Sequence, residues 1–199
     1  LGDVYKRQRD DYDLLRIAGV LHDVGHAPFS HAIEMHVAEA FKVRHEEITA
    51  YIIESDPYLQ EIFSEYGISA KEVASIIRGT HKEPIYNMLL SSDIDADRID
   101  YLLRDSLHTG VAYGMIDVDR LLHTITVDKD GELAIPSKSV QAIENFYIAR
   151  MHMYRAVYHH KTIAAFQVMM KKIYELLLNE LREYLEPFTT MSSILRSIR

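Results

Sequence analysis

Residues 10–34 read DDYDLLRIAGVLHDVGHAPFSHAIE, and this stretch indicates how the chain folds. In its first half, apolar residues recur three and four positions apart up to Leu21, which is the spacing of one face of a helix. Gly25 and Pro28 then interrupt the pattern, and it resumes over about residues 29–41. We therefore expect two helices joined by an irregular, polar turn.

The turn between these helices is rich in ionisable side chains, and five of them fall within thirteen residues: His22, Asp23, His26, His31 and Glu34. Where the backbone is irregular, an adjacent imidazole and carboxylate can both reach one divalent cation that takes nitrogen and oxygen ligands. The alternative is a helix end at which histidines favour the helix dipole and an aspartate caps the next turn. Three histidines in one turn broken by glycine and proline favour the functional interpretation.

The ends of the chain give the first limits on its domain organisation. Residues 1–9 show no amphipathic period, so we expect them to be a non-native or disordered leader. Asp10 or Asp11 is expected to cap the first helix. A chain of 199 residues suits one domain, which we place at residues 10–199.

The remaining segments are predominantly helical in pattern. Helices are expected at residues 45–54, 57–65, 70–79, 83–91, 95–108 and 117–123, followed by two long helices between 137 and 185. One β-hairpin is expected, because two short β-prone runs flank the turn sequence DKDG at residues 128–131. The predicted fold class is all-α, a helical bundle with one small β-hairpin near residues 124–135.

A second polar cluster contains the aspartates Asp93, Asp95 and Asp97, whose alternation is typical of a calcium-binding EF-hand loop. The EF-hand interpretation fails, because Arg98 stands where the loop needs glycine and Arg104 where it needs glutamate. This cluster therefore requires another explanation.

On a helix, this second cluster would form one polar stripe. Tyr101, Asp105 and His108 lie roughly 40°, 80° and 20° around the axis from Asp97, at about 100° per residue. Such a stripe can line a cleft. Alternatively, Asp95 or Asp97 is only a helix cap and the other side chains form a solvated face. The sequence of this segment alone does not separate the two interpretations.

Two further clusters contain histidines. His45 beside Glu46 suits proton transfer, because a carboxylate can orient an imidazole, although a capped helix start explains the same residues. Residues 150–161 are basic and aromatic, so they can hold phosphate and sugar or simply form the polar end of a helix pair. The other histidines lack supporting neighbours and are interpreted as structural or surface residues: His36, His81, His123 and His152.

Composition excludes several classes of protein. The 199 residues contain no cysteine, which excludes disulfides and thiolate-bound metals. No apolar run is long enough to cross a bilayer and no signal peptide is visible, so we expect a cytoplasmic protein with no membrane partner. The net charge of -8, with basic residues scattered among acidic ones, argues against nucleic acid as a partner but not against a small phosphorylated substrate.

Taken together, the first two clusters resemble the HD superfamily. The narrower resemblance is to its deoxynucleoside triphosphate triphosphohydrolases, which include bacterial dGTPase-like enzymes and the vertebrate SAM- and HD-domain enzyme. Residues 22–31, HDVGHAPFSH, are similar to the family string HD-x-GH-x-PFSH, and residues 95–105, DADRIDYLLRD, to D-x-D-[KR]-x-DY-x-x-RD. A third, weaker likeness is YHHK at residues 158–161, so the resemblance covers about residues 10–161.

The resemblance implies a divalent metal ion (Mn, Mg, Fe or Zn) held by an upstream histidine, a His-Asp pair and a distant aspartate. His22, Asp23 and Asp97 match the last three of these ligands, and no histidine precedes His22. We therefore expect a fragment truncated at the N-terminus, and also at the C-terminus, where the sequence stops within a helical pattern. Such a fragment lacks one metal ligand, which puts its activity in isolation in doubt.

The same resemblance implies the roles of the other site residues and the reaction. The catalytic residues would be His45, Glu46 and His31, and the substrate would be bound by His26, Arg98, Tyr101, Asp105, Arg155 and His160. The implied reaction converts a deoxynucleoside triphosphate to a deoxynucleoside and inorganic triphosphate. The implied full-length protein is a homo-oligomer.

Two other functions remain open at this point. One is another HD phosphohydrolase, such as a 5′-nucleotidase or a cyclic-nucleotide phosphodiesterase. The Pro-Phe-Ser-His extension at residues 28–31 and the Tyr101–Asp105 pair favour the triphosphohydrolase over it. The other is a non-catalytic HD protein that binds nucleotide or nucleic acid, which only the missing first metal ligand supports.

Overall fold

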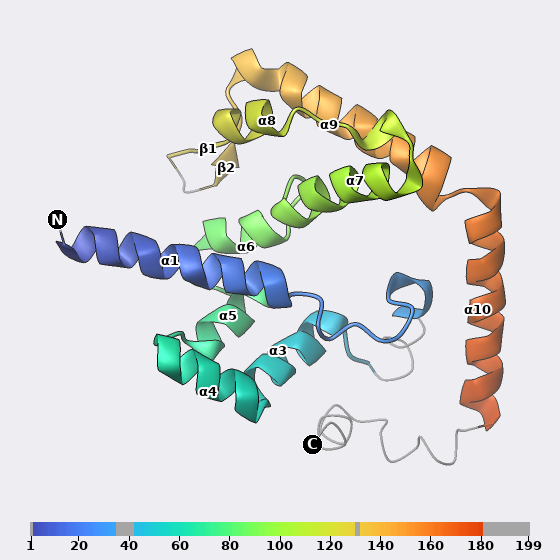
Figure 1. Cartoon of the computed structure of the whole chain (residues 1–199), viewed down its shortest axis with the longest axis horizontal. Coiled ribbons are helices and arrows are strands. Elements are labelled where there is room, and N and C mark those ends of the chain that lie inside the picture. Colours follow the sequence, from blue (N-terminus) through green and yellow to red (C-terminus); the bar gives the residue numbers. More distant parts are fainter. Residues whose placement is uncertain (1, 35–41, 130–131, 181–199) are drawn as a thin grey trace. The chain divides into compact units, whose positions relative to one another are not determined.

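The computed structural model describes residues 2–34, 42–129 and 132–180 of the chain (Figure 1). By its internal contacts the chain divides into two compact units. The first comprises Leu1–Arg78 and Ala165–Arg199, and the second comprises Gly79–Ala164.

Four helices form the core of the first unit: α1 (Gly2–Leu21), α3 (His45–Ser55), α4 (Pro57–Tyr66) and α5 (Ala70–Ile77). Helix α5 packs against both α1 and α3, and its buried residues Val73, Ala74 and Ile76 belong to the core. Asp56 caps α4 by accepting from two backbone N–H groups, and Ser69 caps α5 in the same way through one. These caps explain why the chain turns sharply between the three short helices.

Arg78, directly after α5, fastens this helix to α3. Its Nε donates to Glu47 at 3.1 Å, and its two terminal nitrogens donate to both oxygens of Glu54 at 3.0 and 3.1 Å. The hydrogen bonds to Glu54, followed by those to Glu47, raise the pKa of the Arg78 guanidinium, which remains charged at any physiological pH. The bidentate pairing with Glu54 has the parallel two-bond geometry that makes an arginine–carboxylate pair specific.

Replacing Arg78 with methionine is expected to lower the free energy of unfolding by about 1 kcal/mol, because the bridge is partly exposed and solvent screens it. Urea denaturation of the variant measures this change. Lys71→Met is the matched control, because it removes an exposed cation from α5 itself. Equal unfolding midpoints for the two variants would show that the bridge contributes no stability.

The second unit is built from helices of uneven length and one hairpin. Its helices are α6 (Pro84–Leu90), α7 (Ala96–Thr109), α8 (Val118–Thr124) and α9 (Val140–Met153), with 3₁₀ turns at Ala112–Gly114 and Ser137–Ser139. A π-helical segment, Tyr154–Tyr158, follows α9 and precedes α10 (Lys161–Glu180). The core of the unit consists of Leu102, Leu121, Phe146 and Met153.

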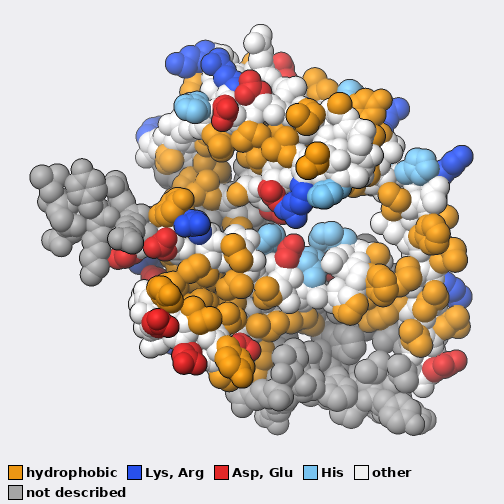
Figure 2. Space-filling view, in the orientation of Figure 1, with side chains coloured by type: hydrophobic (Ala, Val, Ile, Leu, Met, Phe, Trp, Pro, Cys, Tyr) orange, Lys and Arg blue, Asp and Glu red, His pale blue; other side chains and the backbone are white. Residues whose placement is uncertain are grey.

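The hairpin of the second unit pairs β1 (Thr126–Val127) with β2 (Leu133–Ala134) in antiparallel register, Thr126 opposite Ala134. The prediction of an all-α fold with one small hairpin near residues 124–135 is therefore confirmed. Among the described residues, no helix has the length and apolar character needed to span a membrane. Figure 2 shows hydrophobic side chains exposed along α10, which include Phe166, Val168 and Met169.

Two expected boundaries were wrong. Helix α1 begins at Gly2 and runs through Asp10 and Asp11, so neither aspartate caps it. The helix expected from Phe29 or Ser30 begins at His31 instead, because both earlier residues have positive φ angles, 68° and 41°, that a helix cannot contain. The expected remainder of that helix, beyond Glu34, lies outside the described residues.

Candidate functional site

The His-Asp pair lies in a tight turn at the end of α1. The backbone N–H of Val24 donates to Leu21 O at 3.1 Å, and that of His26 donates to Asp23 O at 3.0 Å. The Nδ1–H of His22 donates to Gly19 O at 2.8 Å, so its Nε2 carries the lone pair that a metal ion requires. Asp23 Oδ1 lies 3.2 Å from His22 Nε2 and 3.4 Å from His26 Nε2.

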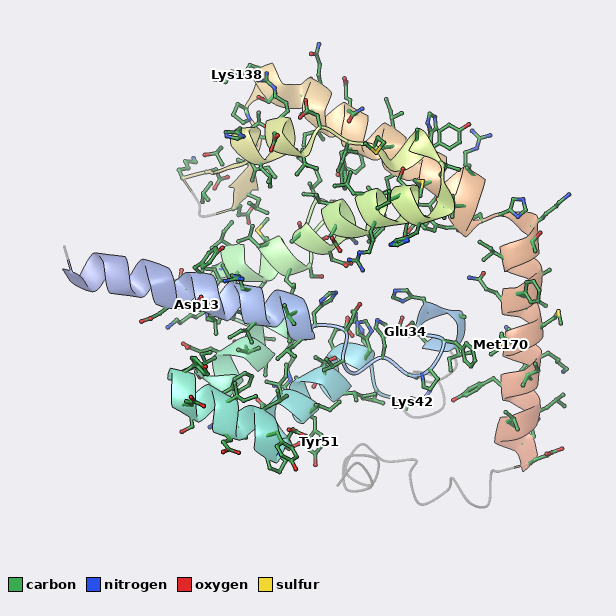
Figure 3. The ribbon with its side chains drawn as sticks, viewed as in Figure 1. Asp13, Glu34, Lys42, Tyr51, Lys138 and Met170 are labelled. Carbon is green, nitrogen blue, oxygen red and sulfur yellow. The ribbon has the colours of Figure 1, made fainter. Side chains whose placement is uncertain are left out.

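Glu34 joins the two histidines that were predicted to be catalytic. Its Oε2 lies 2.9 Å from His31 Nδ1, and its Oε1 is hydrogen bonded to His45 Nδ1. The Glu34 side chain is labelled in Figure 3. Burial raises the pKa of the Glu34 carboxyl, but the hydrogen bonds from His31 and His45 outweigh this effect and lower it overall. Glu46 Oε2 lies 3.5 Å from the same His45 nitrogen. Two carboxylates therefore lie at the His45 ring, with Glu34 making the closer contact and Glu46 the longer one.

His26 is enclosed by the other imidazoles of the site. Its ring stacks on that of His45 with centroids 3.9 Å apart, and it meets the ring of His31 edge-on at 4.8 Å. Only 9% of its side chain is exposed. Burial and the neighbouring His45 lower the pKa of His26, so near neutral pH it is a neutral imidazole with a lone pair to donate.

The donor set of this turn fits a divalent cation. Within the described residues, two groups each bring their donor atoms within 4.8 Å of one another: Asp23, His26 and His45, and His26, His31 and Glu34. Imidazole nitrogens and carboxylate oxygens suit Mn, Fe or Zn, and a carboxylate also suits Mg. His26 Nε2 is buried and makes no hydrogen bond within the described part of the chain, as expected of a nitrogen that faces an ion or a phosphate.

The second unit carries the other predicted cluster on α7. Asp95 caps this helix, accepting from Arg98 N at 2.7 Å and Ser92 N at 3.0 Å, and is nearly fully buried. The Arg98 guanidinium donates to Asp95 and to Ser92 O. Asp97 lies in the first turn of α7, after the cap. Asp95 is thus the structural aspartate of the pair, and metal binding by Asp97 stays a prediction.

Tyr101 and Asp105 face residues from the C-terminal part of the second unit. Arg150 Nε donates to Tyr101 Oη at 3.5 Å, and Tyr158 Oη donates to Asp105 Oδ2 at 2.7 Å. Burial and the hydrogen bond to Asp105 raise the pKa of Tyr158, so its phenol stays protonated and a donor. The Tyr101 and Tyr158 rings meet edge-on, with centroids 6.1 Å apart.

The remaining predicted substrate-binding residues, Arg155 and His160, are exposed. Arg155 lies within the π-helical segment, a form of helix that is frequent at functional sites. His160 Nδ1 accepts from Thr162 N at 3.3 Å, which fixes the orientation of its ring at the start of α10.

Thr49 was not predicted, and Arg150 and Tyr154 were predicted only as members of the basic and aromatic cluster at residues 150–161, without a role of their own. Thr49 bridges the His-Asp turn to α3, and the Arg150 guanidinium lies 5.0 Å from the centroid of the Tyr154 ring. Arg150, Tyr154 and Tyr158 are spaced four apart, which places them on one helical face, and this spacing could have identified them.

The histidines interpreted as structural or surface residues fit that interpretation where they are described. His81 is buried, and its Nδ1 accepts from Glu83 N at 3.1 Å. The exposed His123 Nδ1 contacts Asp119 O at 2.7 Å. His152 packs edge-on against Tyr113, and His36 lies outside the described residues.

Comparison with known proteins places this helical fold and histidine–carboxylate site in a class of phosphohydrolases. Residues 1–105 match the family model of the HD domain, and residues 116–194 match that of an HD associated region. The chain belongs to the HD domain family.

Several relatives are similar over most of the chain. An uncharacterized protein of Methanocaldococcus jannaschii is 38% identical over 170 residues, which are 81% of this chain and 33% of the relative. The uncharacterized protein YwfO of Bacillus subtilis is 35% identical, over 86% of this chain and 40% of the relative. The deoxynucleoside triphosphate triphosphohydrolase SAMHD1 homolog of Dictyostelium discoideum is 30% identical, over 78% of this chain and 32% of the relative.

Among solved structures, a phosphohydrolase from Bacteroides thetaiotaomicron matches with a TM-score of 0.63 and 35% identity. The match covers 79% of this chain and 37% of that protein. The chain thus spans between a third and two fifths of the length of the first two relatives and of this structure.

Proposed function

We propose that this chain is the catalytic core of a metal-dependent phosphohydrolase that converts deoxynucleoside triphosphates to deoxynucleosides and inorganic triphosphate. The observation that carries the proposal is the Glu34 carboxylate joining His31 and His45, beside the Asp23 and His26 of the His-Asp turn. The substrate class is supported by the SAMHD1 relatives, which are named as deoxynucleoside triphosphate triphosphohydrolases. A homo-oligomeric state and a cytoplasmic location stay predictions.

The proposed metal ligands in this chain are His22, Asp23 and Asp97. Asp23 Oδ1 lies 3.2 Å from His22 Nε2, so both can serve one ion. When bound, a divalent ion there neutralises the charge of a phosphate and acts as a Lewis acid. The hydrogen bond from His22 Nδ1 to Gly19 O holds the imidazole in the tautomer that such binding requires.

His45 is the proposed general acid. Its Nδ1 faces Glu34 and Glu46, so its Nε2 is the atom that can deliver a proton to the 5′-oxygen that leaves the α-phosphorus. The two carboxylates orient the ring for this step. His31, held by Glu34, and His26, stacked on His45, are proposed to contact the phosphate under attack.

The second unit supplies the proposed contacts to the sugar and the triphosphate. Tyr101 would pack on the deoxyribose and limit space for a 2′-hydroxyl, while Asp105 would accept from the 3′-hydroxyl. Arg98, Arg155 and His160 are the proposed triphosphate contacts. We add Arg150, because its guanidinium already lies at the Tyr101 hydroxyl.

A substrate screen tests the proposal. The protein that carries this chain in its full reading frame is incubated with each dNTP, a nucleoside monophosphate and a cyclic nucleotide, in Mn²⁺, in Mg²⁺ or in chelator. We expect inorganic triphosphate and deoxynucleoside from the dNTPs only with metal present. Turnover of the monophosphate or the cyclic nucleotide instead would favour another HD phosphohydrolase, and turnover of none would favour a binding protein.

Sugar selection is expected to depend on Tyr101 and Asp105. The wild type should prefer dATP to ATP, and should disfavour a 3′-deoxy analogue even more, because a site that hydrogen bonds a hydroxyl rejects an analogue that lacks it. Asp105→Ala is expected to weaken the second preference and Tyr101→Ala the first, both measured as ratios of kcat/KM.

Asp100→Ala is the matched control for Asp105→Ala, because its carboxylate lies on the same helix and pairs with the exposed Arg104. Equal turnover of ATP and dATP by the wild type, or unchanged ratios in both site variants, would refute the assignment. In that case Tyr101 would be only a core residue packed beneath α7, as its contact with the buried cluster allows.

A further inference from the structure

A buried hydroxyl joins the two ends of the His-Asp turn. Thr49, in the second turn of α3, has no exposed surface. Its Oγ1–H donates to His22 O at 3.0 Å, and the same oxygen accepts from Gly25 N–H at 2.9 Å. One side chain thus holds the first and last residues of the segment that contains both the imidazole and the carboxylate of the pair.

The two backbone groups that Thr49 satisfies would otherwise be costly to bury. His22 directly follows α1, where helical carbonyls run out of intrahelical partners, and Gly25 N–H points into the interior. A buried polar group without a hydrogen-bond partner costs the free energy of its lost hydration. Turn geometries in which His22 O and Gly25 N–H do not reach the Thr49 hydroxyl are therefore disfavoured. The turn is consequently shaped by α3 as well as by its own backbone.

Gly25 shows how closely the turn is pressed against α3. A Cβ atom at this position would lie 2.5 Å from Thr49 Oγ1 and 2.6 Å from His45 O, so no side chain fits there. His45 and Thr49 are four residues apart and therefore share one face of α3. The contact with Thr49 therefore also sets the position of the His-Asp turn relative to His45. His26, the residue after Gly25, stacks its ring on that of His45 with centroids 3.9 Å apart.

We infer that Thr49 is a positioning residue of the catalytic site. Its hydroxyl holds His22 and Asp23 in one geometry relative to His45, without itself touching metal or substrate. This inference rests on the proposed function, because it takes His22 and Asp23 as metal ligands and His45 as the general acid.

The test compares Thr49→Val, which keeps the shape and loses the hydroxyl, with Thr49→Ser, which keeps the hydroxyl. Mn²⁺ affinity is measured by EPR titration of the full-length protein without substrate, well below the melting temperature of each variant. We expect Thr49→Val to raise the Kd for Mn²⁺ by about 10- to 100-fold, the usual effect of losing an outer-shell partner, and Thr49→Ser to restore it within about threefold. In turnover at saturating Mn²⁺, kcat should fall in Thr49→Val with little change in KM for the dNTP.

Thr124→Val is the matched control, because it removes another buried hydroxyl, one that donates to Leu121 O at 2.9 Å within its own helix. It should leave the Mn²⁺ affinity unchanged. The inference is overturned if Thr49→Val binds Mn²⁺ like the wild type, if Thr49→Ser is as weak as Thr49→Val, or if Thr124→Val is equally weak.

Two further outcomes are separable from these. If Thr49→Val does not fold, Thr49→Cys is measured in its place. The cysteine side chain has the shape of serine, but its thiol is only a weak hydrogen-bonding group. The Thr49→Cys variant should therefore bind Mn²⁺ more weakly than Thr49→Ser. Equal binding by Cys and Ser variants would then overturn the inference. If Asp23→Ala binds Mn²⁺ as tightly as the wild type, the proposed function itself fails, whatever the Thr49 variants do.

Discussion

Replacing His45 with alanine is expected to lower kcat for dNTP hydrolysis by about 10²- to 10⁴-fold, the contribution typical of a positioned general acid. The KM for the dNTP should change little, because the proposed sugar and triphosphate contacts lie elsewhere in the chain. The expectation depends on the hydrogen bond from His45 Nδ1 to Glu34, which leaves Nε2 for proton transfer. Steady-state kinetics of the full-length protein at saturating Mn²⁺ measure the effect.

Glu34→Gln should show a smaller loss of kcat in the same direction, because an amide oxygen can still accept the hydrogen bond that orients His45, but more weakly than a carboxylate does. His123→Ala is the matched control, since this exposed histidine contacts only a backbone carbonyl of its own helix among the contacts described. A His45→Ala variant that keeps the wild-type kcat would contradict the proposed proton donation by His45. The residue would then be only the first residue of α3, without a catalytic role.

Replacing Asp23 with alanine is expected to raise the Kd for Mn²⁺ by at least about 10²-fold, more than the loss of an outer-shell partner. The carboxylate lies 3.2 and 3.4 Å from the Nε2 atoms of His22 and His26, and it supplies the negative charge of this donor set. Activity should fall with the affinity, and excess Mn²⁺ should restore only part of it.

Asp119→Ala serves as the control for Asp23→Ala, because it removes an exposed carboxylate from the first turn of α8. EPR titration gives the Kd of both variants without relying on turnover. Unchanged Mn²⁺ affinity in Asp23→Ala would contradict the proposed function, because the ion would then lie on ligands other than the His-Asp pair, such as the His26, His31 and Glu34 group.

Much of the first site could be read from local sequence, because its residues are close along the chain. Gly25 and Pro28 break the helical pattern, as the sequence predicted, and the His26 ring lies against the rings of His31 and His45. Glu34 was among the recognised polar residues, and it contacts His45 only eleven positions further along the chain.

The parts that sequence did not reveal depend on packing between distant segments. In the sequence, nothing distinguishes Thr49 from the other residues of its helical segment. Its role is visible only in the folded chain, where its hydroxyl is hydrogen bonded to the backbone of His22 and Gly25. Asp95 and Asp97 are equivalent by spacing, and only burial and capping distinguish the first as structural. Arg150 meets Tyr101 across forty-nine positions, a separation at which helical periodicity carries no information.

Hydrolysis in water enriched in ¹⁸O tests the central claim most directly. The full-length protein is supplied with dNTP and Mn²⁺, and both products are analysed by mass spectrometry. If water attacks the α-phosphorus while a histidine protonates the leaving 5′-oxygen, one ¹⁸O atom appears in inorganic triphosphate and none in the deoxynucleoside. Label in the deoxynucleoside, or release of pyrophosphate or orthophosphate in place of triphosphate, would contradict the account.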